Sequence, residues 1–197
     1  MTALTMRRRG AGAKGSKYLM TATSNPEVFP LCVEQGWCSA AGMTYEDAAA
    51  VTDIARVFQR SNIVHFEELE YFGVTEFKYS AFMSCKNLDT ITFPTNLLKF
   101  NGSAIFQECL KLKNIDIPST VTNIGANCFS SCPNIQYAIV RPTIPPTLGN
   151  GTVFGATGTT YPIYVPDESV DAYKAANYWN GGIIVNRIKP ISEFVQP

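Results

Sequence analysis

The chain has 197 residues, of which 46% are hydrophobic and 16% are charged. This composition describes one folded domain, or one domain with a short appendage, and excludes an intrinsically disordered chain. The sixteen basic and sixteen acidic residues cancel. The net charge therefore points neither to nucleic acid nor to an anionic membrane as a partner.

The chain opens with a basic segment that contains no acidic residue. Its cations are Arg7, Arg8, Arg9, Lys14 and Lys17. A signal peptide needs an apolar stretch directly after such a start, but small residues and lysines follow here. We therefore expect residues 1–24 to form a basic, flexible arm, which is either a disordered tail or a segment that docks on a partner, and we expect no secretion signal. The sequence has no run of about 18 apolar residues, so it predicts no membrane-spanning helix.

Residues 25–62 are expected to form an N-terminal helical cap. Thr44-Tyr-Glu-Asp47 matches a capping box at the start of a helix. Apolar residues recur at helical spacing from there through Ile54 to Phe58. This pattern predicts one amphipathic helix that packs on the following part of the chain.

The strongest pattern lies in residues 63–142, where Phe-x-x-Cys-x-x-Leu/Ile occurs three times at offsets of 24 and 23 residues. A period of about 20–29 residues with this apolar spacing predicts stacked coils joined by parallel strands, as in a leucine-rich-repeat solenoid. The phenylalanines are expected to form one buried column, and the cysteines to be reduced core thiols rather than disulfides. The three pairs are Phe82 with Cys85, Phe106 with Cys109, and Phe129 with Cys132.

Residues 143–197 are expected to form a C-terminal cap. The segment 143–160 is rich in proline and glycine, which predicts a loop. A strand is expected at Ile163–Val165, and a short helix should begin at Asp167. Residues 183–188 are expected to be the closing edge strand.

The repeat Phe-x-x-Cys-x-x-Leu-x-x-Ile-x-Ile-Pro, with the flanking segments 66–75 and 163–174, resembles the BspA-like leucine-rich-repeat family of bacterial surface and adhesion proteins. The resemblance covers about residues 43–190. It implies an α/β repeat fold: a short leucine-rich-repeat solenoid with parallel strands, an N-terminal helical cap and a C-terminal strand-helix-strand cap. Family members are described as binding host proteins, other cells or surfaces. Versions without a signal peptide and with an Arg-rich start resemble proteins carried by phages and prophages of gut bacteria.

These features favour a non-enzymatic recognition module that binds a protein or a glycan. The resemblance implies an accessory structural component of a phage particle, found in the virion or in the bacterial cytoplasm during assembly, with the arm contacting other virion proteins. A bacterial cell-surface adhesion protein and a cytoplasmic scaffold protein remain alternatives. We expect no catalytic residue, cofactor or metal, because the single histidine, His65, has no nucleophile at a plausible spacing. The nearby Glu67, Glu68 and Glu70 are interpreted as solvated charges.

The expected binding face lies on the strands of the repeats, where residues between the inward leucines point away from the core. Tyr137 is the expected anchor, because an exposed aromatic side chain contributes contact area at low entropic cost. The alternative is that these positions are ordinary solvated strand residues. The full set is Asp89, Thr90, Thr92, Lys113, Asn114, Asp116, Gln136, Tyr137 and Ile139.

Overall fold

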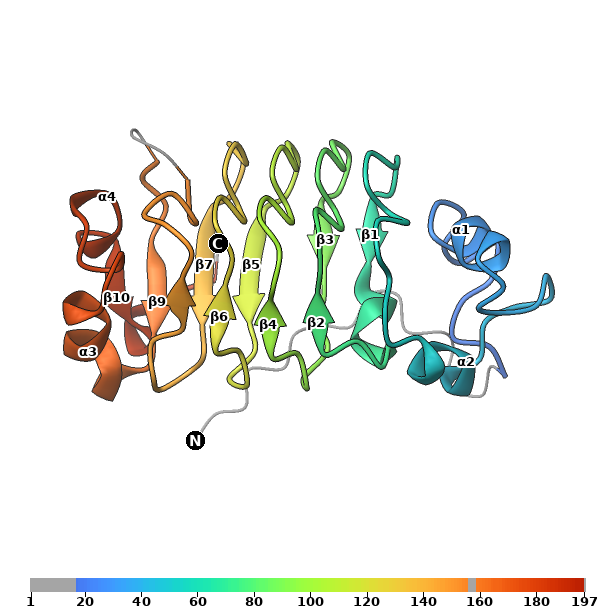
Figure 1. Ribbon diagram of the computed structural model, residues 1–197, viewed down its shortest axis with the longest axis horizontal. Helices are drawn as coiled ribbons and strands as arrows, with labels where there is room; N and C mark the ends of the chain where they lie inside the picture. The colour runs from blue at the N-terminus through green and yellow to red at the C-terminus, as the bar shows by residue number, and fades with distance from the viewer. Residues whose placement is uncertain (1–16, 156–158, 197) are drawn as a thin grey trace.

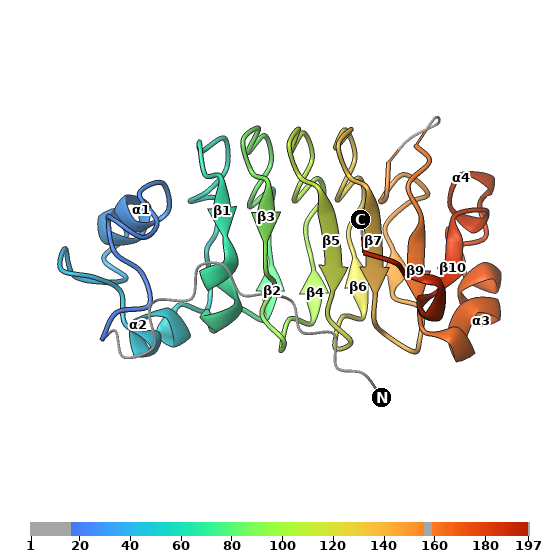
Figure 2. The same ribbon diagram turned by 180° about the vertical axis from the view of Figure 1, so that it is seen from behind.

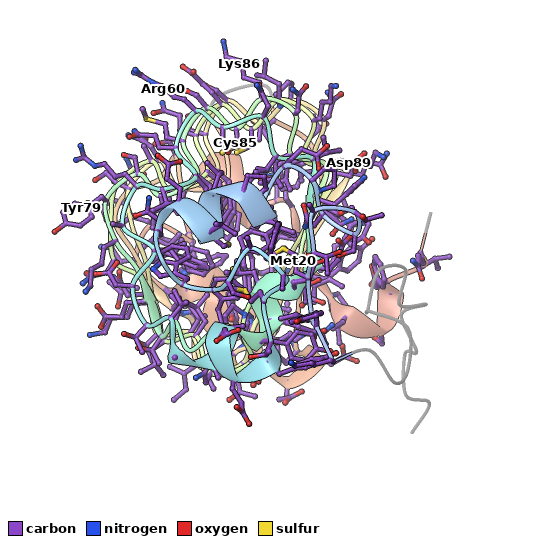
Figure 3. All side chains as sticks on the ribbon, turned by 90° about the vertical axis from the view of Figure 1, so that its right-hand side faces the viewer. Met20, Arg60, Tyr79, Cys85, Lys86 and Asp89 are labelled. Atoms are coloured by element: carbon purple, nitrogen blue, oxygen red, sulfur yellow. The ribbon has the colours of Figure 1, made fainter. Side chains whose placement is uncertain are left out.

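The computed structural model describes residues 17–155 and 159–196, which form a row of stacked coils between two caps (Figures 1 and 2). All pairs between the described strands are parallel, as expected for coils that stack in register. Seen end-on, the coils superimpose on one another (Figure 3). The α/β repeat solenoid predicted from the 24-residue period is therefore confirmed.

Each coil contributes strands to two separate faces. The first face is built from two sheets, one of β1 and β3 and one in the order β5-β7-β9-β10; the second face has the order β2-β4-β6-β8. The strands of the first face are β1 (His65–Phe66), β3 (Thr90–Ile91), β5 (Asn114–Ile117), β7 (Tyr137–Val140), β9 (Ile163–Val165) and β10 (Ile188–Pro190). Those of the second face are β2 (Glu76–Phe77), β4 (Lys99–Phe100), β6 (Asn123–Ile124) and β8 (Thr147–Leu148).

A ridge of tight turns forms a third side of the coils. In each turn one residue other than glycine has a left-handed backbone, with φ between 58° and 62°. Such a residue costs about 1–2 kcal/mol in isolation. Here the amides of the first three of these residues donate to carbonyls of the following coil, at 2.7–3.1 Å, which helps to offset that cost. The four ridge residues are Arg60, Ser84, Glu108 and Ser131.

A column of phenylalanine rings runs through the core. Phe82 stacks on Phe106 with centroids 4.8 Å apart, and Phe106 stacks on Phe129 at 5.4 Å. The predicted column is therefore confirmed, and it is longer than predicted. Phe58 stacks below Phe82 at 5.5 Å, and Phe154 stacks beyond Phe129 at 5.8 Å. All five rings are at most 1% exposed, so the repeated packing extends on both sides of residues 63–142.

The cysteines of the repeats form a second column beside the rings. The thiol of Cys85 donates to the carbonyl oxygen of Phe58, 2.8 Å away in the preceding coil. Cys109 and Cys132 make the equivalent bonds to Phe82 and Phe106, at 3.3 and 3.0 Å. All six cysteines of the chain are free thiols. The cysteine at this position therefore fills a small apolar space and also satisfies a buried carbonyl, which alanine could not do.

We expect the thiols of the native protein to be largely unreactive at neutral pH, with Cys38 as the exception. Burial raises the pKa of Cys85 to about 11, so the nucleophilic thiolate is suppressed. Cys38 is only partly buried and therefore accessible, although burial raises its pKa as well. A chromogenic disulfide reagent should therefore titrate one thiol ahead of the other five in the native state and all six rapidly in denaturant.

Dithiothreitol should leave the melting temperature unchanged, because no disulfide contributes to stability. A drop of many degrees in reductant, or fewer than six thiols in denaturant, would show instead that disulfides join the coils.

Close backbone contact defines the corner between the second face and the ridge. Gly125 follows β6 and lies against the carbonyl of Gly102 in the preceding coil. A Cβ atom at Gly125 would overlap that carbonyl oxygen. Gly149 lies equally close to the backbone of Ala126 in the coil before it. Glycine is therefore required at this corner because two coils touch through their backbones.

The N-terminal cap contains α1 (Phe29–Glu34) and α2 (Tyr45–Ala50). The predicted capping box is present: the Asp47 amide donates to Thr44 Oγ1 at 3.1 Å, and the Thr44 amide donates to Asp47 Oδ2 at 2.8 Å. The prediction of one helix continuing to Phe58 is wrong. α2 ends at Ala50, and Val51 has an extended backbone. The apolar residues after Ala50 belong to the first coil instead, and Phe58 stacks on Phe82 in the ring column.

The C-terminal cap contains η2 (Asp167–Ser169), α3 (Val170–Ala175), α4 (Gly182–Val185) and β10, followed by η3 (Ile191–Glu193). The strand at Ile163–Val165 and the helix beginning at Asp167 are confirmed. The strand expected at 183–188 is wrong at its start, because α4 occupies that segment and the closing strand begins at Ile188. The segment 143–160 is also more than a loop, since it contains β8 and Phe154.

Ion pairs join neighbouring coils, and each of the four pairs between described residues links an acid to a base in the following coil. Lys78 pairs with Asp53 at 3.1 Å, beside the first coil. Lys99 pairs with Glu76 at 3.6 Å across the second face. All of these side chains are partly exposed, so each pair contributes about 0–1 kcal/mol. The pairs support the register, and the core supplies most of the stability. The two remaining pairs lie on the first face.

Candidate binding face

The alternation of side chains along the short strands places most of the predicted site on the outer surface of the first face. Of the nine predicted residues, seven are exposed or half-buried. We call these seven, together with His65 and Glu67 from the first coil, the open face. Eight of them come from three successive strands, β1, β3 and β5, and from the residues that flank these strands, and Gln136 directly precedes β7. The open face consists of His65, Glu67, Asp89, Thr90, Thr92, Lys113, Asn114, Asp116 and Gln136.

The prediction that Tyr137 is an exposed anchor is wrong, and so is the exposure expected for Ile139. Tyr137 is 6% exposed and Ile139 is 1% exposed. Their β7 side chains do point outward, but residues 191–194 fold back across the sheet and cover them. The ring of Phe194 lies 4.8 Å from that of Tyr137 and 5.1 Å from that of Tyr164. Residues 191–194 therefore cover the apolar half of the first face (Figure 2), and among residues 17–155 and 159–196 none covers the polar half in the same way.

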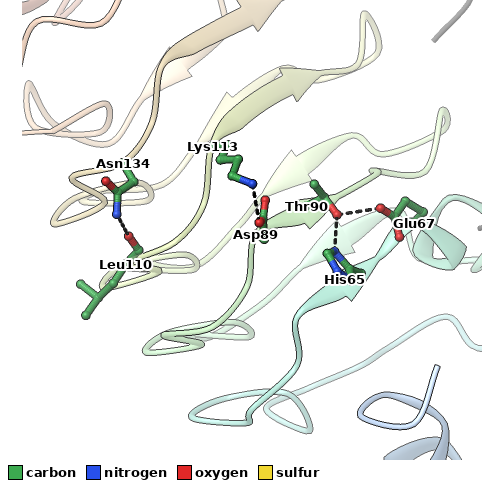
Figure 4. A network of polar contacts seen from close by, with 7 residues as sticks. All are labelled: His65, Glu67, Asp89, Thr90, Leu110, Lys113 and Asn134. Carbon is green, nitrogen blue, oxygen red and sulfur yellow. Dashed lines mark hydrogen bonds and ion pairs between the residues drawn. The ribbon is translucent and has the colours of Figure 1, made fainter. Parts of the chain in front are cut away.

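Two ion pairs cross the open face. Lys113 Nζ donates to Asp89 Oδ2 at 2.6 Å (Figure 4). Arg141 holds Asp116 with two parallel bonds of 2.6 and 2.7 Å. The hydrogen bonds that Arg141 donates to Asp116 raise the pKa of Arg141 above its ordinary value. Because Lys113, Asp89 and Asp116 are already paired, the open face presents fixed hydrogen-bonding groups rather than a field of one sign.

A chain of hydrogen bonds orients His65. Thr90 Oγ1 donates its single hydrogen to Glu67 Oε1 at 2.6 Å (Figure 4). Thr90 Oγ1 also lies 3.0 Å from His65 Nδ1, and it can only accept there. Nδ1 must therefore carry the proton, which leaves Nε2 of the neutral ring as an acceptor.

We expect the neutral form of His65 to be the Nδ1–H tautomer in solution. The chain contains one histidine, so nitrogen-15 NMR of the imidazole reports this residue without assignment. Thr90→Val removes the hydroxyl and should return the ring to a mixture of tautomers. Thr92→Val, at an exposed position of the same strand segment, is the matched control and should change nothing. The same tautomer mixture in wild type and in Thr90→Val would contradict the hydrogen-bond chain.

The acidic residues beside His65 have separate roles. Glu68 was expected to be solvated, and this is wrong: it is 5% exposed. Its Oε2 accepts a hydrogen bond of 2.9 Å from Asn25 Nδ2, which joins the N-terminal cap to the first coil. Burial raises the pKa of Glu68 above its ordinary value. Within the described ranges, no group of three or more His, Cys, Asp or Glu side chains could hold a metal ion.

The prediction of a flexible arm over residues 1–24 is wrong at its end, because Leu19 and Met20 are at most 1% exposed and form backbone hydrogen bonds with Met43. Residues 1–16 of the predicted docking arm lie outside the described residues. This applies to Arg7, Arg8, Arg9 and Lys14. Lys17 is described, and its Nζ lies 5.4 Å from the centroid of the Tyr18 ring. The docking role of the arm therefore stays a prediction. Across residues 17–155 and 159–196, no helix has the length and apolar character needed to cross a membrane.

This architecture defines a repeat solenoid whose coils stack through parallel strands and a shared aromatic core. The BspA type leucine rich repeat region matches residues 54–161 in six copies, which is more than half of the chain. The chain therefore belongs to the BspA-type leucine-rich-repeat family, which confirms the resemblance seen in its repeats. Proteins of this family are generally non-enzymatic, and membership indicates a protein-binding repeat module. The chain matches no curated protein.

Proposed function

We propose that this chain is a non-enzymatic recognition module that binds a protein partner through the open face. The observation that carries the proposal is the division of the first face. Its apolar half is covered by residues 191–194, whereas the residues of its polar half, on β1, β3 and β5, are exposed or half-buried among the described part of the chain. Solenoids use such extended sheet surfaces for binding.

The chemistry of the open face favours a polar, extended segment of a protein. Its ion pairs and the His65–Thr90–Glu67 chain fix donors and acceptors on neighbouring strands. The backbone amides and polar side chains of an extended segment can form hydrogen bonds with such groups. The aromatic residue that could stack on a sugar, Tyr137, is covered. A glycan ligand is therefore the second outcome that the experiment must distinguish.

The test compares two lysine reversals. A partner recovered from host-cell extract by crosslinking, and then purified, is titrated against Lys113→Glu and Lys99→Glu. Both lysines flank or occupy short strands, both are about half-exposed, and both pair with an acid of the preceding coil. They differ in that Lys113 lies on the open face and Lys99 on the second face. We expect Lys113→Glu to weaken binding at least tenfold and Lys99→Glu to leave it within twofold.

Equal effects of the two reversals would show that the open face is not the site. Failure to bind any protein, together with binding on a glycan array, would replace the protein partner with a sugar.

We further propose that the module acts as an accessory component of a phage particle. The support is the resemblance of its repeats and Arg-rich start to repeat proteins carried by phages, in which the arm would contact other virion proteins. Mass spectrometry of purified particles tests this setting. Detection in stoichiometric amounts supports it. Recovery from the surface of intact bacteria, with none in particles, would favour the adhesion role, and recovery from the cytoplasm alone would favour a scaffold.

A further inference from the structure

A polar cavity lies on the ridge, away from the open face. It has a volume of about 410 Å³ and opens between the turns of the first coils. All of its lining residues are polar or charged, although their carbon atoms contribute almost as much of its surface as their polar atoms. Four of the six are exposed, so the cavity is open to solvent and a ligand would be held mainly by hydrogen bonds and charge. The lining residues are Arg60, Ser61, Asn62, Ser84, Lys86 and Glu108.

The cavity carries two cations with no bound acid. Neither Arg60 nor Lys86 takes part in any of the four ion pairs between described residues. Both project from the ridge in the end-on view (Figure 3). The one acid in the lining, Glu108, already accepts a hydrogen bond of 2.8 Å from Ser84 Oγ. The lining therefore has a net positive charge that an anionic group could neutralise.

The cations do not follow from the repeat. The position of Arg60 is occupied by Ser84, Glu108 and Ser131 in the later coils, and the position two residues after it reads Asn62, Lys86, Leu110 and Pro133. Two cations from neighbouring coils therefore line the cavity at one junction of the ridge. The next junction carries Ser84 and Leu110 in place of cations. A structural need of the coil would place the same charges at every turn, so these cations require another explanation.

The remaining lining groups indicate a ligand that carries hydroxyls. The side-chain amide of Asn62 is exposed and forms no hydrogen bond with another described residue. Glu108 and Ser84 offer oxygen atoms that can accept from hydroxyl groups. A guanidinium binds a carboxylate through two parallel bonds. We propose that this ridge cavity binds an acidic sugar, with Arg60 and Lys86 on its carboxylate and the other polar side chains on its hydroxyls.

The experiment uses two sugars that differ at one group. Glucuronate carries a carboxylate where glucose has a hydroxymethyl group, so the pair isolates the contribution of the charge. Each sugar is titrated into the full chain and followed by NMR shifts of backbone amides. We expect saturable shifts at Ser61, Asn62 and Ser84 with glucuronate, and at least tenfold weaker binding of glucose. Sodium sulfate is the third titrant, because it carries charge without hydroxyl groups.

Arg60→Gln and Lys86→Gln should each weaken glucuronate binding at least fivefold. Lys111→Gln is the matched control, because Lys111 is an exposed cation near the same ridge but does not line the cavity. All three variants should keep the wild-type melting temperature, since their side chains are exposed. Equal binding of glucuronate and glucose would overturn the proposal, and so would sulfate binding as tight as glucuronate. Loss of binding in Lys111→Gln, or no ridge shifts with any titrant, would overturn it too.

Discussion

Truncation of Phe106 to alanine is expected to lower the free energy of unfolding by about 3–5 kcal/mol, as for other large-to-small changes at fully buried aromatic residues. Phe106 is fully buried at the centre of the column, with rings stacked on both sides at 4.8 and 5.4 Å. Phe77, Phe93 and Phe100 also contact it edge-on or at a tilt. Its removal leaves a cavity in the middle of a short array, where each coil depends on its neighbours.

Thermal and urea unfolding followed by circular dichroism measure this effect. Leu110→Ala is the matched control, because Leu110 lies in the same coil and is 39% exposed. The control should melt within a few degrees of wild type. If Phe106→Ala also melted cooperatively within a few degrees of wild type, the stacked column would not be the main source of stability.

Gly125→Ala is expected to destabilise the domain by about 1–3 kcal/mol, the usual cost of overpacking a close contact. A methyl group at Gly125 would overlap the carbonyl oxygen of Gly102, and both atoms belong to backbone held in the stacked coils. Neither coil can relax without weakening the ladder of β4 and β6. Even one added methyl group is therefore expected to lower the stability, because the two coils are in backbone contact at Gly125.

Gly151→Ala is the control for Gly125→Ala, because a Cβ atom at Gly151 would have nothing within 4 Å. It should be neutral or slightly stabilising, since alanine restricts the unfolded chain. Urea midpoints for the two variants measure the difference. Equal midpoints would show that the coils can separate at this corner without cost.

The repeated core was predictable from the sequence because its residues recur at one period. Phe82, Phe106 and Phe129 share a spacing that fixes them in one column, whatever the detailed backbone. Phe58 was missed because the expected helix absorbed it. A usable signal was present: Phe58-x-x-Ser61 has the repeat pattern with serine in place of cysteine, 24 residues before Phe82. The apolar spacing before Phe58 fits a coil as well as a helix, and stacking on Phe82 decides between them.

The errors in the candidate site have a different physical cause. Alternation along a strand correctly places Tyr137 and Ile139 on the outer surface, but it does not report what covers that surface. The covering residue, Phe194, lies 57 residues beyond Tyr137 in the sequence and shares no period with the repeats. The ridge cavity was also not predicted. Its two cations lie in different repeats of the sequence, and only the stacking of the turns places both of them in the lining of one cavity.

The path of the last residues matters for any experiment that attaches the protein to something else. Phe194 is packed over β7, whereas Val195 is 82% exposed, so the chain leaves the domain beside the open face (Figure 2). A fusion tag, a fluorophore or a solid support joined after residue 196 would stand next to the surface proposed to bind a partner, and could mask it. The second face offers a safer point of attachment. A cysteine placed at Leu98, which is 43% exposed and precedes β4, would lie on neither the open face nor the lining of the ridge cavity.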